Sequence, residues 1–192
     1  MVAVNSTMLP LGTPAPEFSL PDPSGTVWSL DQVAGERGTL VAFVCNHCPY
    51  VRHVAVEFGA AAARWIRAGV GVIGINSNDV SAYPIEEPDT MAEHAARWNW
   101  RFPYVSDSDQ SVAQAYRAAC TPDFFLFDDA SRLVYRGRMD GSTPGNDVPV
   151  TGAELDAAIT AMLSGEPISG EQIPSIGCNI KWKPGNKPAW FG

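Results

Sequence analysis

Short apolar runs and one long helical repeat alternate along the first half of the chain. Residues 40–44, 70–75 and 124–127 are continuous apolar runs with the length and composition of buried strands. Between the first two, residues 49–69 carry their apolar side chains on one helical face and end at a glycine. This strand–helix–strand order predicts a parallel crossover, and a parallel sheet has to be covered on both faces.

The other segments predict further strands and helices around this core. Turn-forming residues separate two short strands in a predicted hairpin, and a second hairpin follows the last apolar run. Two Thr-x-x-Glu motifs predict capping boxes that open helices. The pattern therefore predicts an α/β fold, with helices on both faces of one central mixed sheet. The additional elements expected are the hairpin of 17–20 and 26–30, helices opened by Thr90 and Thr151, a short strand at 102–105, a helix ending at Tyr116, and a strand at 133–135.

Chain length and proline content predict a single domain with two appendages. We expect residues 1–192 to form one domain, with a core at about 14–165. Residues 1–13 are predicted to be an extended N-terminal arm. The C-terminal extension, residues 166–192, holds four prolines and two tryptophans and is too apolar for simple disorder. We expect it to wrap over the body of the domain.

The charge balance excludes several classes of partner. The formal net charge of −8 argues against nucleic acid or an anionic membrane surface. No run approaches the roughly 18 apolar residues that a membrane span needs. The first 12 residues lack the basic and apolar regions of a signal peptide. We therefore expect a cytoplasmic protein that binds neither nucleic acid nor membrane.

Two of the four cysteines, Cys45 and Cys48, form a Cys-x-x-Cys motif between an apolar run and Pro49. A helix that begins here would favour the thiolate form through its N-terminal N–H groups. The spacing is typical of a redox disulfide or of half a zinc site. Structural zinc needs four ligands, and the chain has no second pair. We therefore predict redox chemistry with no metal and no cofactor. A metal carrier that uses the two cysteines and a histidine is the non-enzymatic alternative.

The chain resembles the thioredoxin-like superfamily in three places. These are the N-terminal hairpin, residues 43–49 around the motif, and residues 120–128. In particular, they resemble its peroxiredoxin-like (AhpC/TSA, redoxin) branch with a Cys-x-x-Cys motif, over about residues 14–165. The resemblance implies a thioredoxin-like fold. It also implies a cis peptide bond between Thr121 and Pro122, beside the active cysteines. The alternative is that Pro122 begins a strand in the trans form.

One chemistry that the resemblance implies is thiol–disulfide exchange. In this reaction Cys45 is an exposed nucleophile at the helix start, and Cys48 resolves the mixed disulfide that forms. His47 would support the Cys45 thiolate, or it is a solvated linker residue. The expected partners are a disulfide-bearing protein or small thiol, and a cellular dithiol reductant.

The other implied chemistry is a thiol peroxidase in which Cys48, followed by Pro49, attacks a hydroperoxide. Two features of peroxiredoxins are missing here. Cys45 stands where they carry threonine or serine, and Pro122 stands where they carry arginine. Arg52 or Arg117 would have to replace that arginine. Exchange is therefore the favoured reaction, with the peroxidase as the alternative.

Four further residues are left with open roles. Cys120 is either an auxiliary thiol or, as we favour, a small buried apolar side chain. Cys178 either lies near the site as an additional resolving cysteine or anchors the C-terminal extension by packing. The strand before the motif lacks the buried carboxylate of thioredoxins, so Glu57 or Glu93 would accept a proton only if the fold brought it close.

Overall fold

A five-stranded mixed sheet forms the centre of the protein in a computed structural model that describes residues 3–168 and 170–191. Strands β4 and β5 are parallel, as the crossover predicts, and β6 continues the parallel part. Strands β8 and β9 are antiparallel additions at the other side. The order is β6-β5-β4-β8-β9, with bounds Tyr104–Ser106, Val70–Asn76, Gly38–Phe43, Asp123–Phe127 and Leu133–Gly137.

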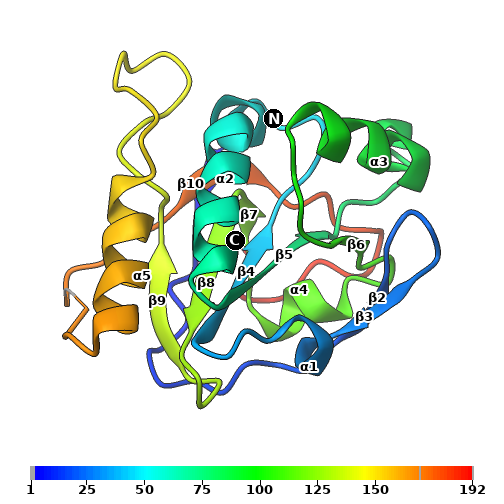
Figure 1. Ribbon diagram of the computed structural model, residues 1–192. Coiled ribbons are helices and arrows are strands. Elements are labelled where there is room, and N and C mark those ends of the chain that lie inside the picture. Colours follow the sequence, from blue (N-terminus) through cyan, green and yellow to red (C-terminus); the bar gives the residue numbers. More distant parts are fainter. Residues whose placement is uncertain (1–2, 169, 192) are drawn as a thin grey trace.

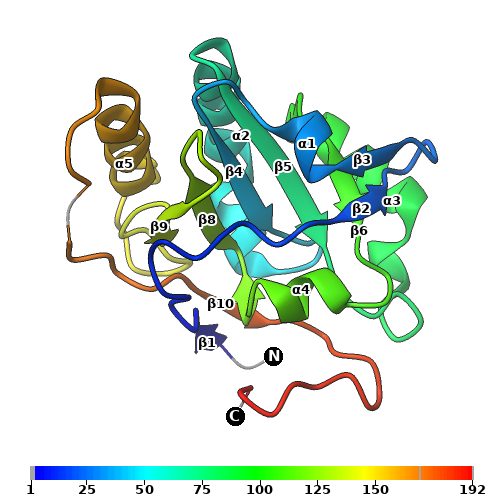
Figure 2. The same cartoon turned by 90° about the horizontal axis from the view of Figure 1, so that it is seen from below.

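The two faces of the sheet support separate apolar cores, because side chains alternate along β4. Leu40 and Ala42 pack against helices α2 and α5, and Val41 and Phe43 pack toward α1 and α4. Figures 1 and 2 show these helices on opposite faces of the sheet. The predicted α/β sandwich is therefore confirmed. The helices are α1 (Leu30–Val33), α2 (Pro49–Arg67), α3 (Pro88–Arg97), α4 (Ser111–Ala115) and α5 (Ala153–Ser164).

A second, three-stranded sheet joins the two ends of the chain. Its order is β1-β10-β7, with bounds Ala3–Asn5, Ile176–Asn179 and Cys120–Thr121. The C-terminal extension crosses beneath the body, and its strand β10 lies between β1 and β7 (Figure 2). The N-terminal arm, expected only to be extended, thus contributes a strand. The predicted N-terminal hairpin is present as β2 (Ser19–Pro21) and β3 (Val27–Ser29).

Both predicted capping boxes are wrong, for different local reasons. Helix α3 begins at Pro88, which has the fixed φ suited to a first helical turn, so Thr90 lies inside the helix. Helix α5 has Gly152 at its N-cap in the left-handed conformation. The main-chain N–H groups of Thr151 and Gly152 donate instead to Asp140. This distant carboxylate replaces the local cap that the Thr151 motif predicted.

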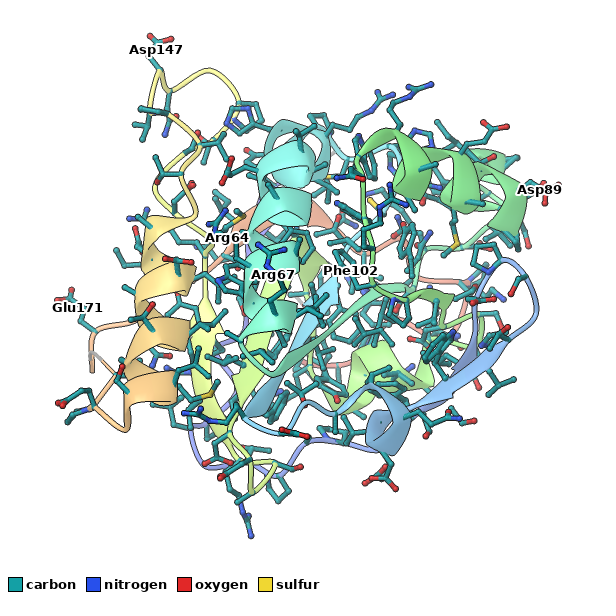
Figure 3. The ribbon with its side chains drawn as sticks, in the orientation of Figure 1. Arg64, Arg67, Asp89, Phe102, Asp147 and Glu171 are labelled. Carbon is teal, nitrogen blue, oxygen red and sulfur yellow. The ribbon has the colours of Figure 1, made fainter. Side chains whose placement is uncertain are left out.

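Several charged side chains lie at the edges of the molecule. Figure 3 shows Asp147 on the loop that leads to α5, Asp89 at the beginning of α3, and Glu171 on the C-terminal extension. Arg64, on α2, approaches Asp156 of α5 at 3.7 Å. No helix in the described part of the chain is long and apolar enough to cross a membrane.

Candidate active site

The Cys-x-x-Cys motif lies where β4 ends and α2 begins. Cys45 follows the end of β4 at Phe43, and Cys48 is the N-cap residue of α2, with Pro49 in its first turn. The expectation of an exposed Cys45 at the helix start is wrong. Cys45 is 1% exposed and Cys48 is fully buried, and Cys45 precedes the helix by four residues. The burial follows from position, because both side chains join the core between the sheet and α2.

Thr121 holds both cysteines from the opposite side. The Thr121–Pro122 peptide bond is cis, as the resemblance implied. The Thr121 hydroxyl lies 3.2 Å from Cys45 Sγ, and its carbonyl oxygen lies 3.1 Å from Cys48 Sγ. A single residue of β7 therefore contacts each sulfur of the motif through a different oxygen.

The surroundings of Cys48 favour its thiolate. The thiol of Cys45 donates to its sulfur, the Cys178 thiol is a further donor, and the Val51 N–H in the first turn of α2 lies near it. These groups lower the pKa of Cys48 from 9.0 to about 5, against the opposing effect of burial. The Thr121 carbonyl favours the protonated form, but it is one acceptor against four donor groups, since the Cys178 main-chain N–H also donates to Cys48.

The surroundings of Cys45 have the opposite effect. Burial raises the pKa of Cys45 well above 9.0, and so do the proton it shares with Cys48 and the nearby charge of Glu86. These surroundings favour the thiolate on Cys48 and the thiol on Cys45. The sequence analysis expected Cys45 to be the activated nucleophile, and the order of attack is taken up as a proposal below.

Glu86 is the buried carboxylate of the site, and the sequence analysis did not identify it. It lies in the short helix η1 (Pro84–Glu86), is fully buried, and accepts hydrogen bonds from the main-chain N–H groups of Asn46 (2.8 Å) and His47 (3.1 Å). Asn76, at the end of β5, donates to it at 2.8 Å. Burial acts to raise the pKa of Glu86, but the hydrogen bonds from the His47 side chain, the Asn46 N–H and the Asn76 side chain hold it below 4.5.

Neither of the two glutamates considered from the sequence has this role. Glu57 lies on the outer side of α2 and approaches Arg64, and Glu93 is exposed on α3. One signal for Glu86 was available in the chain order. Residues that follow adjacent parallel strands meet at one sheet edge, so the loop after β5 had to lie beside the motif after β4.

His47 is turned toward Glu86, and it is neither a donor to Cys45 nor a solvated linker. Its Nδ1 contacts Glu86 Oε1, and its ring stacks on Tyr83 with centroids 5.1 Å apart. Ligand atoms of Cys45, His47 and Glu86 lie within 4.8 Å of one another. They are the described residues closest to a metal-binding set, but Glu86 already accepts bonds from its four protein donors.

A comparison of the sequence with protein families places this site in a known context. The profile described as the AhpC/TSA family matches residues 11–136, from the N-terminal arm through β9. The chain belongs to the AhpC/TSA family. Proteins named as peroxiredoxins are among its relatives, thiol–disulfide oxidoreductases are among its structural neighbours, and the chain has a thioredoxin-like fold. The chain spans 65% of the length of the first curated relative it matches.

Three similar proteins show how far this likeness extends. An uncharacterized conserved protein from Geobacillus kaustophilus has 47% sequence identity and a TM-score of 0.94, covering 96% of this chain and 98% of its own. A protein from Coxiella burnetii named as a peroxiredoxin (bcp) is 28% identical over 55% of this chain and 65% of its own length. A thiol:disulfide interchange protein DsbE from Chlorobium tepidum shares the fold, with 20% identity, a TM-score of 0.61, and coverage of 81% and 99%.

Neither of the two arginines considered from the sequence replaces the arginine that peroxiredoxins carry at the position of Pro122. The two arginines considered from the sequence are both exposed. Arg52 lies on the outer side of the first turn of α2, and the guanidinium of Arg117 lies over the ring of Trp190, 5.6 Å from its centroid. Neither arginine is among the groups that lower the pKa of Cys48, which are uncharged hydrogen-bond donors.

The C-terminal extension brings another cysteine to the site. Strand β10 pairs with β7 so that Cys178 lies opposite Thr121, and the Cys178 and Cys48 side chains hydrogen-bond. Cys120 is also buried, but its sulfur lies near the carbonyl oxygens of Pro122 (3.5 Å) and Ser175 (3.9 Å). The structure therefore separates the two remaining cysteines: Cys178 reaches the motif, and Cys120 lies in the packing beneath β10.

A cavity of about 280 Å³ opens beside the cis-proline. Its walls include Tyr50 of α2, Pro122, Arg138 and Ile176 of β10. The cysteines themselves do not line it, but its mainly apolar walls with a few polar groups have the character of ligand sites in proteins.

Close contact between β10 and Thr121 requires glycine at position 177. A Cβ atom there would lie 2.0 Å from the Thr121 carbonyl oxygen, a backbone atom that cannot move aside. We expect Gly177→Ala to loosen β10, so that limited proteolysis cuts the extension at least about tenfold faster, which corresponds to about 1.4 kcal/mol. Gly170→Ala is the control, because a Cβ at this exposed position meets nothing within 4 Å. Equal cleavage rates in the two variants would contradict the expectation.

Proposed function

We propose that this protein is a thiol–disulfide oxidoreductase that cycles Cys45 and Cys48 between a dithiol and a disulfide. The observation that carries the proposal is the shared proton of the pair. Cys45 donates to Cys48, and the groups around them push the two pKa values in opposite directions. A pair in this state has one thiolate ready to attack and one thiol ready to resolve.

The reaction begins on Cys48. Its thiolate attacks a disulfide R–S–S–R, forming a Cys48–S–S–R bond and releasing one thiolate, RS⁻. The Cys45 sulfur then attacks Cys48 Sγ, and its proton passes to the second RS⁻ as that group leaves. The substrate disulfide is reduced to one thiol and one thiolate, which takes a proton from solvent, and the Cys45–Cys48 pair is oxidised. A dithiol reductant returns the protein to its starting state.

Burial of both sulfurs favours a small disulfide over a large protein as the substrate. An extended peptide substrate would bind by pairing with the main chain of Thr121. That main chain already pairs with β10, so this edge is occupied. The donors to Cys48 stabilise the reduced state, so we expect a reduction potential above the roughly −270 mV of thioredoxin.

Trapping variants test the order of the two cysteines. In each variant Cys178 is replaced, because it would otherwise resolve an adduct on Cys48. With oxidised glutathione at pH 7, Cys45→Ser/Cys178→Ser should retain a glutathione adduct on Cys48, at a level at least about tenfold above any adduct of Cys48→Ser/Cys178→Ser. Mass spectrometry of peptides locates the adduct. If the adduct accumulates on Cys45 instead, the order proposed here is wrong.

Burial of a low-pKa Cys48 also supports peroxidase activity as a second candidate. In that reaction the Cys48 thiolate attacks a hydroperoxide, giving a sulfenic acid and an alcohol, and Cys45 condenses with the sulfenic acid to release water. The lack of a described arginine at the sulfur makes this the weaker candidate. Hydroperoxide consumption that depends on Cys48 and outpaces disulfide reduction would establish it.

A further inference from the structure

The C-terminal strand is fixed on both sides of Cys178. Before it, the Ser6 N–H donates to the Ser175 carbonyl at 2.9 Å. After it, the Ile180 N–H donates to Ala119 at 3.1 Å, and the Lys181 N–H donates to Asn78 at 2.9 Å. These bonds join β10 to the N-terminal arm, to the segment before β7 and to the loop after β5. The position of Cys178 is therefore set by the fold.

The strand register places Cys178 on the residue that holds the motif. Cys178 pairs with Thr121, and Gly177 allows the two backbones to approach. The same Thr121 contacts Cys45 through its hydroxyl and Cys48 through its carbonyl. Three sulfurs thus surround one threonine, and Cys48 hydrogen-bonds with each of the other two.

We propose that Cys178 is a third redox residue of this site, which displaces Cys45 to form a Cys48–Cys178 disulfide. This inference rests on the proposed function, since it begins from the Cys45–Cys48 disulfide. The Cys178 sulfur attacks Cys48 Sγ, so that the Cys48–Cys178 bond forms as the Cys45–Cys48 bond breaks. The proton of Cys178 passes to Cys45. No external oxidant is needed, because one disulfide is exchanged for another.

The electrostatics of the site are consistent with this transfer. In the reduced state, burial and the adjacent Cys48 raise the pKa of Cys178 to about 12, so Cys178 is a poor nucleophile. Once Cys48 is in a disulfide, its negative charge is gone, and Cys178 ionises more easily. Cys45 accepts the proton readily, because burial and Glu86 favour its thiol form. After the exchange the disulfide joins Cys48 to Cys178 of the C-terminal extension, and Cys45 is a thiol.

The experiment uses oxidised glutathione on two variants that lack Cys45. In Cys45→Ser, Cys178 should attack the Cys48–glutathione adduct, forming the Cys48–Cys178 disulfide and releasing reduced glutathione. The adduct should therefore be at least about tenfold less abundant than in Cys45→Ser/Cys178→Ser, since a positioned thiol has a high effective concentration. Non-reducing peptide mass spectrometry detects both species. Cys45→Ser/Cys120→Ser is the matched control and should behave as Cys45→Ser does.

The outcomes separate this inference from the proposed function. Equal adduct levels with and without Cys178, and no Cys48–Cys178 peptide, would overturn the inference. The single variant Cys178→Ser should still form the Cys45–Cys48 disulfide in the same buffer, and its failure to do so would count against the proposed function itself. Thermal unfolding of each variant confirms that the serine replacements, which keep the side-chain shape, preserve the fold.

Discussion

The stability advantage of the reduced wild-type protein over Cys48→Ser is expected to shrink by about 2 kcal/mol as the pH falls from 7 to 5. The pKa of Cys48 is lowered from 9.0 to about 5 in the folded state, so the folded protein binds fewer protons than the unfolded chain between these values. This contribution is complete above the unfolded pKa and is lost as the pH falls through the folded pKa. Urea unfolding of both proteins under reducing conditions measures it.

The comparison with the variant is needed because another group titrates in the same range. Burial raises the pKa of Asp123 from 3.8 to about 7, so Asp123 gains protons on folding there and acts in the opposite direction. Asp123 is present in both proteins, and its effect cancels in the difference. Cys120→Ser is a control, since burial raises the pKa of Cys120 and this thiol stays protonated throughout. A constant difference between wild type and Cys48→Ser would show that Cys48 is not a thiolate at pH 7.

The same ionisation determines reactivity. The ultraviolet absorbance of the thiolate should change near pH 5 in the wild type. This change should be absent in Cys48→Ser. A thiol with a pKa four units below its ordinary value loses intrinsic nucleophilicity, by a factor of about 10² at a Brønsted coefficient near 0.5. The ionised fraction at pH 6 rises by about 10³ over the same shift. The net gain is about tenfold, largest in mildly acidic solution.

The sequence predicted the parts of the fold that depend on local pattern. The apolar run of β4, the helical repeat of α2 and the motif between them are continuous in the chain, so their arrangement follows from strand–helix–strand geometry. The cis bond before Pro122 came from the family resemblance. These elements were sufficient to place Cys45 and Cys48 together and to suggest redox chemistry.

The parts that were missed depend on contacts between distant residues. Strand β1 has three residues and β10 has four, which is too short for a periodic pattern of apolar residues. Each of them is a strand because it pairs with the other. The location of Cys178 beside Cys48 was therefore left open. The different surroundings of the two cysteines were not predicted either, because the pKa of Cys45 is raised by burial, by Cys48 and by Glu86, which is 41 positions away in the chain (86 − 45).

Replacing Glu86 with alanine is expected to destabilise the protein by about 3 kcal/mol or more at pH 7. The substitution removes the acceptor of the Asn46 and His47 main-chain N–H groups and of the Asn76 side chain. Each buried donor left without a partner costs roughly 1–3 kcal/mol. Glu87→Ala is the matched control, because this neighbour is exposed and makes no side-chain cap on α3. Its cost should stay within about 0.5 kcal/mol.

The pH dependence and the thiols provide two further checks on Glu86. Its folded pKa is lowered below 4.5, so its contribution is present above that value and is lost as the pH falls below it, outside the range in which Cys48 titrates. Glu86→Gln, which removes the charge but keeps the shape, should lower the pKa of Cys45, because the negative charge raises it. In a Cys48→Ser/Cys178→Ser background this change should increase the glutathione adduct on Cys45. An unchanged adduct level, with the protein folded, would show that Glu86 holds the backbone of the motif without directing attack to Cys48.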